Sequence, residues 1–187
     1  IAFIWKEPNT NCLHLEQVHQ IVRMLAIQLR LLSNTGVLIT ETNVPEKENL
    51  SYLNNREEAN MAYNFTLPPL LLEALITNKA DLINKWLCSC PDLPANTTLL
   101  NFTASHDGIG LRALEGIMEQ KRIHELLVSA EKRGGLISHR RLSDGQDKPY
   151  ELNISWWSAM ADDIDNLISL QLERFLLSQT FILSLRG

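Results

Sequence analysis

The stretch that decides the fold is Asn101-Phe102-Thr103-Ala104-Ser105-His106-Asp107-Gly108-Ile109-Gly110. An apolar, β-prone run from Thr98 to Thr103 leads into a His-Asp pair, and glycines that allow a sharp turn come after it. We predict that this run is a strand and that the imidazole and the carboxylate lie on a loop at its C-terminal end. In a β/α barrel, that rim of the strands carries the active site.

A second stretch has the same layout. Val37-Leu38-Ile39-Thr40 is a short apolar strand pattern, and Glu41 comes directly after it. Glu41 and Asp107 are 66 residues apart, which leaves room for two βα steps with a short middle strand near Tyr63. Parallel strands end on the same side of a sheet, so we expect both acids at one rim, close together. Paired carboxylates indicate glycosidic-bond chemistry.

These stretches resemble a known family. Thr40–Pro45 and Ala104–Gly110 are similar to two conserved regions of glycoside hydrolase family 13, the α-amylase family. The His-Asp-Gly-Ile-Gly form resembles the sucrose phosphorylase-like branch, and the region of Glu41 resembles its glucosylglycerate phosphorylase members most. Tyr63–Pro68 and Tyr150–Ala159 agree with this resemblance, which runs over nearly all 187 residues.

The resemblance implies an α/β fold that is part of a (β/α)8 TIM barrel, about strands five to seven with their helices and a hairpin insertion. Residues 1–187 would be the central part of the catalytic domain. In the family, a nucleophilic aspartate ends the fourth strand. The run that begins at Ile1 resembles the family segment that comes directly after this aspartate. We therefore expect the first strands, the nucleophile and the eighth strand to lie outside the chain. An open sheet of this kind would need to be closed by another chain, for example a second copy in a homo-oligomer, or by a rearrangement of the sheet.

The resemblance also implies an activity. A retaining α-glucoside phosphorylase transfers glucose by double displacement from sucrose or a glucosylglycerate-like donor to inorganic phosphate, so the expected partners are an α-glucoside and phosphate, without a cofactor. The chain alone would be inactive because the nucleophile is missing. An α-glucosidase or transglucosidase of the same family is one alternative. A non-catalytic sugar-binding or degenerate domain is the other.

Site residues carry over from the family motifs. Glu41 would be the general acid/base, and Asp107 would be the third carboxylate, which binds sugar hydroxyls and stabilises the transition state. His106 would hydrogen-bond the same sugar. Without the resemblance, Glu41 is equally well a solvated loop acid, and Asp107 a residue that caps a turn.

A third segment, Asp144–Glu151, resembles an acceptor-site loop of sucrose phosphorylase-like enzymes. Lys148 and Glu151 stand where sucrose phosphorylase has an Asp and a Gln, which speaks against sucrose as the donor. Lys148 would suit an anionic acceptor, and we predict that Lys148, Tyr150 and Glu151 bind substrate. The alternative is an ordinary charged hairpin tip.

Composition and charge exclude several other classes of function. A net charge of -5 shows no basic field for a nucleic acid, and no apolar run is long enough to span a membrane. Cys12, Cys88 and Cys90 fit a reducing cytoplasm. Cys88-Ser89-Cys90 could suggest a metal site, but no second pair stands at ligand spacing, so we predict none. The remaining histidines are interpreted as structural: His14, His19, His124 and His139.

Hydrophobic periodicity predicts strands that alternate with helices, and therefore a parallel sheet. Trp156 and Trp157 are interpreted as strand residues, at most one of which faces a sugar. No domain boundary is apparent. The predicted helices are Leu15–Leu32, Leu67–Cys90 with a break near Asn78, Gln120–Arg133, and one from Asp163 towards Gly187; the predicted strands, besides the two above, are Met61–Phe65 and a hairpin of Leu136–Leu142 with Tyr150–Ser155.

Overall fold

The computed structural model describes residues 1–142, 144–161 and 168–187, which form an α/β fold. Contacts divide the chain into two compact units, each with its own three-stranded sheet. The first unit comprises Ile1–Asn64, Pro91–Leu100 and Arg186–Gly187, and the second comprises Phe65–Cys90 and Asn101–Leu185. No helix in the described part of the chain is both long and apolar enough to cross a membrane.

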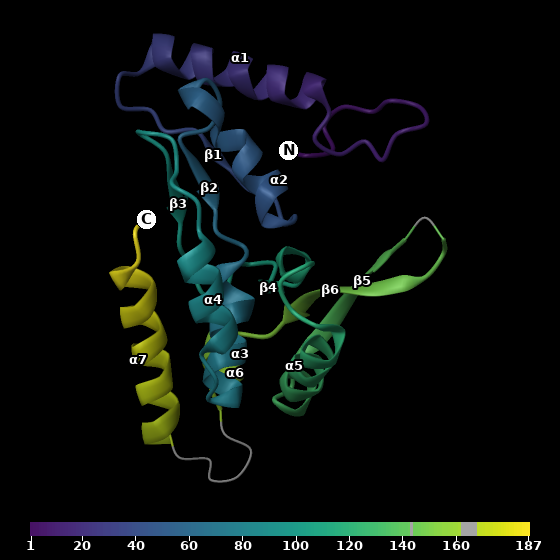
Figure 1. The fold of residues 1–187 in the computed structure, drawn as a ribbon, viewed down its shortest axis with the longest axis vertical. Helices are drawn as coiled ribbons and strands as arrows, with labels where there is room; N and C mark the ends of the chain where they lie inside the picture. Colours follow the sequence, from purple (N-terminus) through teal and green to yellow (C-terminus); the bar gives the residue numbers. More distant parts are fainter. Residues whose placement is uncertain (143, 162–167) are drawn as a thin grey trace. The chain divides into compact units, whose positions relative to one another are not determined.

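The sheet of the first unit is parallel, as the alternation of strands and helices predicted. Its strands lie in the order β1 (Ile39–Thr40), β2 (Met61–Tyr63) and β3 (Thr98–Leu100) (Figure 1). Thr40 is paired with Ala62, which is paired in turn with Leu99. The C-terminal ends of the three strands therefore lie at the same edge of this sheet, and they differ by no more than one residue along the register.

The third strand is shorter than we predicted. The predicted strand Thr98–Thr103 ends at Leu100, and residues 101–104 are irregular. The reason is that its neighbour β2 ends at Tyr63, so the ladder has no further partner. The last bond runs from the Asn64 N–H to the Leu100 carbonyl oxygen, at 3.0 Å.

One long helix packs on the first unit through an apolar stripe. Helix α1 (Glu16–Leu32) buries Val18 and Val22, one helical turn apart, against Tyr52. This confirms the helix predicted from periodicity. Two shorter helices complete the unit between β1 and β2: α2 (Glu46–Leu50) and the 3-10 helix η1 (Ser51–Arg56).

The second unit begins with two helices where the sequence predicted one that breaks. Helix α3 (Leu67–Thr77) ends at Asn78, which has a left-handed φ of 55°, and α4 (Asp81–Ser89) comes next. Asparagine tolerates this conformation better than most residues, so it ends the helix. The prediction of a break near Asn78 is confirmed.

The sheet of the second unit is antiparallel, with the order β4 (Ile109–Gly110), β6 (Asp147–Asn153), β5 (Leu136–Arg141). The predicted hairpin is confirmed as β5 and β6. Strand β4 was not predicted: its two residues read as part of a flexible loop, but they pair with Glu151 and Leu152 of β6.

The remaining elements of the second unit are helical: η2 (Arg112–Leu114), α5 (Gln120–Lys132), α6 (Trp156–Ala159) and α7 (Ile168–Ser184). The assignment of Trp156 and Trp157 to a strand was wrong, because a short helix begins here. The Ser155 hydroxyl caps this helix by accepting a hydrogen bond from the Ser158 N–H. Trp156 is buried and donates its indole N–H to Ser178 Oγ at 2.8 Å. The predicted start of the last helix at Asp163 lies outside the described residues.

Candidate functional site

Glu41 leaves the parallel sheet directly after β1. Its two neighbours are buried, with Thr40 and Thr42 each 4% exposed, while Glu41 itself is exposed. The Thr42 hydroxyl donates to Asn49 Oδ1 at 2.6 Å, and Asn49 Nδ2 donates to the Tyr63 carbonyl at 2.8 Å. The backbone that carries Glu41 is therefore fixed to α2 and to the end of β2, while the carboxylate is accessible.

His106 and Asp107 form the tip of a tight turn in the second unit. Ser105 and Gly108 close the turn, since the Gly108 N–H donates to the Ser105 carbonyl at 3.0 Å. The Asp107 N–H donates to Ser105 Oγ at 3.2 Å. The His106 Nε2 and Asp107 Oδ1 atoms lie 3.4 Å apart, and both side chains are more than half exposed. The turn thus presents an imidazole and a carboxylate side by side.

Gly108 is required by the geometry of this turn. Its φ is +95°, which side chains with a Cβ rarely adopt, and a Cβ placed on it would lie 2.3 Å from the Leu152 carbonyl oxygen. The next residue, Ile109, is the register partner of Leu152. The central strand β6 therefore holds the His106–Asp107 turn at close range.

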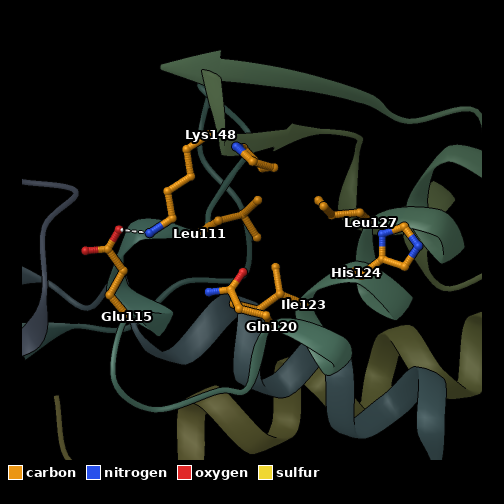
Figure 2. A pocket seen from close by; sticks show the side chains of 8 residues that line it. Leu111, Glu115, Gln120, Ile123, His124, Leu127 and Lys148 are labelled. Carbon is orange, nitrogen blue, oxygen red and sulfur yellow. Dashed lines mark hydrogen bonds and ion pairs between the residues drawn. The ribbon is translucent and has the colours of Figure 1, made fainter. Parts of the chain in front are cut away.

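Lys148 forms part of an ionic cluster around one carboxylate. Its ammonium donates to Glu115 Oε1 at 2.7 Å, and the Arg140 guanidinium donates to the same oxygen at 2.8 Å (Figure 2 shows the lysine contact). Burial raises the pKa of Glu115, but Lys148 and Arg140 outweigh it and hold the pKa below its usual value. Two cations share one anion, so the cluster has one surplus positive charge.

Tyr150 and Glu151 lie on β6 at an irregularity. Ser138 of β5 is paired with Glu151 and His139 with Pro149, so Tyr150 is the extra residue of a β-bulge. The Tyr150 carbonyl accepts the Leu111 N–H at 2.9 Å. Bulges of this kind redirect side chains, and this one lies within the predicted acceptor loop.

The structure brings some of the predicted residues together. His106 contacts Asp107, whereas the Lys148 partner, Glu115, was not among the predicted residues. Local sequence patterns do not indicate this cluster, because Glu115 lies 33 positions from Lys148 and 25 positions from Arg140. Glu41 belongs to the other unit, so its proximity to Asp107 stays a prediction.

Curated relatives match the whole chain. It is 37% identical to the glucosylglycerate phosphorylase of Escherichia coli (strain K12) and 37% identical to that of Allomeiothermus silvanus, with 100% of this chain and 34% of each relative covered. The glucosylglycerate phosphorylase of Spirochaeta thermophila is also 37% identical, with 32% of it covered. The chain thus spans about a third of the length of the curated relatives that it matches. No protein-family model matches.

A solved structure agrees with the fold. The crystal structure of sucrose 6F-phosphate phosphorylase from Thermoanaerobacter thermosaccharolyticum superposes with a TM-score of 0.72 over 96% of this chain and 34% of that one. At 21% identity this likeness bears on the fold alone. The matches to curated glucosylglycerate phosphorylases confirm the resemblance that the sequence motifs indicated, and the solved structure agrees with it in fold.

Proposed function

We propose that the whole protein containing this chain is a retaining α-glucoside phosphorylase, which transfers glucose from a glucosylglycerate-like donor or sucrose to inorganic phosphate. The observation that carries the proposal is the 37% identity to glucosylglycerate phosphorylases along the full chain. Under this proposal β1, β2 and β3 are the fifth, sixth and seventh strands of a TIM barrel. Their parallel order supports this assignment.

Glu41 is the general acid/base of this mechanism. In the first step, an aspartate outside this chain attacks the anomeric carbon, and the Glu41 carboxyl gives its proton to the departing glycosidic oxygen. In the second step, a phosphate oxygen attacks the glucosyl–enzyme ester, and Glu41 takes up the proton of the phosphate. Two inversions leave the α-configuration of the glucose unchanged. The fixed backbone and accessible carboxylate of Glu41 support this role.

Asp107 and His106 bind the glucose ring. The Asp107 carboxylate accepts hydrogen bonds from sugar hydroxyls and stabilises positive charge that develops on the ring in the transition state. His106 adds a hydrogen bond to the same sugar. The closed turn around them, with its required glycine at 108, supports a preorganised site.

Lys148, Tyr150 and Glu151 contribute to the acceptor side. The surplus positive charge of the Lys148–Glu115–Arg140 cluster suits an anion, which describes both phosphate and a carboxylate-bearing aglycone. A glycerate-like aglycone fits this charge better than fructose, which is neutral.

The test is phosphorolysis by the whole protein. With glucosylglycerate as the donor, addition of phosphate should release glucose 1-phosphate, and sucrose should be a poorer donor. Release of free glucose alone would favour an α-glucosidase, and transfer to a sugar acceptor would favour a transglucosidase. Binding of the sugar without turnover would favour a degenerate domain. The isolated chain of 187 residues should release no glucose 1-phosphate, because the expected nucleophile lies outside it.

A further inference from the structure

A cavity of about 200 Å³ lies in the second unit, between η2, α5 and the start of β6 (Figure 2). Its polar wall consists of Glu115, Gln120, His124 and Lys148. In Figure 2 the Glu115–Lys148 pair lies on one side of the cavity and the His124 imidazole on the other. Neither Glu41 nor the His106–Asp107 turn lines it.

The other wall of the cavity is apolar. Leu111 and Leu127 are buried core residues, and Ile123 is the helix neighbour of Leu127 one turn away. Pro149 completes this wall. An apolar pocket with a few polar groups at its edge is the usual form of a small-molecule site.

Hydrogen-bond donors at the edge are available for a ligand. Among the residues that the structure describes, the Gln120 amide and the His124 imidazole have no hydrogen-bond or ion-pair partner. The Lys148 ammonium has three N–H groups and gives one of them to Glu115. Arg140 does not line the cavity but also pairs with Glu115, so the ionic cluster next to this edge carries one surplus positive charge.

We propose that this cavity binds a small carboxylate with a short apolar chain, such as butyrate. The carboxylate accepts hydrogen bonds from Lys148 and Gln120 at the charged edge, and the hydrocarbon chain packs on Leu111 and Leu127. Charge-assisted hydrogen bonds of this kind are stronger than neutral ones, so the anion is selected over an uncharged ligand of the same shape. The site shares Lys148 and Glu115 with the proposed acceptor side and does not depend on turnover.

The experiment is a titration of the isotope-labelled chain, monitored by NMR. Butyrate should shift the amide resonances of 120–127 in a saturable way. Lys148→Gln should weaken this binding by about tenfold or more, since it removes a charged hydrogen bond. Lys121→Gln is the matched control, because Lys121 is exposed on the same helix and does not line the cavity.

Two further probes separate the parts of the proposal. Butanol lacks the charge and inorganic phosphate lacks the apolar chain, so each should bind more weakly than butyrate. Gln120→Ala should also weaken binding, because it removes the second donor to the carboxylate, and it leaves the Glu115–Lys148 pair intact if loss of Lys148 alters the fold. No saturable shift, equal binding of butanol or phosphate, or an equal loss in Lys121→Gln would overturn the proposal. A failed phosphorolysis assay would not, because the titration reads binding alone.

Discussion

The backbone of Gly108 approaches the carbonyl oxygen of Leu152 so closely that an added Cβ would lie 2.3 Å from that oxygen. This contact links the central strand of the antiparallel sheet to the turn that carries His106 and Asp107. The turn is consequently held by packing as well as by its own hydrogen bonds.

Substitution of Gly108 should therefore lower the free energy of unfolding more than substitution of a glycine that has no close neighbour. Gly108→Ala should lower the free energy of unfolding of the chain by about 2–4 kcal/mol, through backbone strain and the clash with Leu152. The control is Gly116→Ala, whose φ of +81° is similar but whose Cβ would meet no atom within 4 Å. It should cost about 1–2 kcal/mol, from the strain alone. Equal losses in urea unfolding would show that the contact with Leu152 carries no weight.

A buried carboxylate in the first unit should be needed for stability. Glu58 is 2% exposed, and its two oxygens accept from His19 Nδ1 at 2.7 Å and from Arg23 Nε at 3.1 Å. Glu58→Ala leaves these partners without their anion and should lower the free energy of unfolding by about 3 kcal/mol.

The control for Glu58 is a second acid that contacts the same arginine. Glu16 is exposed and lies 3.2 Å from Arg23, so Glu16→Ala should cost below about 1 kcal/mol. Thermal and urea unfolding of both variants would measure the difference. A Glu58→Ala chain as stable as Glu16→Ala would mean that the buried pair is not needed.

The pKa of Glu115 predicts a pH dependence of stability. Burial raises the pKa, but Lys148 and Arg140 lower it more, so the folded chain has a lower pKa for Glu115 than the unfolded chain. The stabilisation is therefore present above the ordinary value of 4.5 and is lost as the pH falls through the folded pKa.

Glu115→Gln should accordingly lower the free energy of unfolding at neutral pH by at most about 1 kcal/mol, since the pair is partly exposed. The difference in the free energy of unfolding between this variant and the unaltered chain should become smaller in acid. Urea midpoints over a pH series measure this, with Glu119→Gln as an exposed control that has no ion pair among the described residues. A difference that grows in acid would contradict the sign.

Local patterns in the sequence predicted most of the fold but not its long-range pairs. The stripe of α1 and the break at Asn78 depend on neighbouring residues, so periodicity finds them. Strand β4 has only two residues and owes its conformation to β6, whose first paired residue, Glu151, is distant in sequence. For the same reason local sequence patterns do not indicate the ion pairs of Glu58 and Glu115, since their partners are far away along the chain.

The central claim, that Glu41 is the acid/base of a retaining phosphorylase, is tested most directly by comparing two donors in the whole protein. Glu41→Gln should lower the rate of glucose 1-phosphate release from glucosylglycerate by about 10²–10⁴-fold, because the leaving oxygen needs a proton. With α-glucosyl fluoride, whose leaving group needs no proton, the variant should keep most of the rate of the first step, measured as fluoride release in the first turnover. Asp107→Asn should lose activity with both donors, because it acts on the glucose ring. Equal losses of Glu41→Gln with both donors, or full activity with glucosylglycerate, would contradict the account.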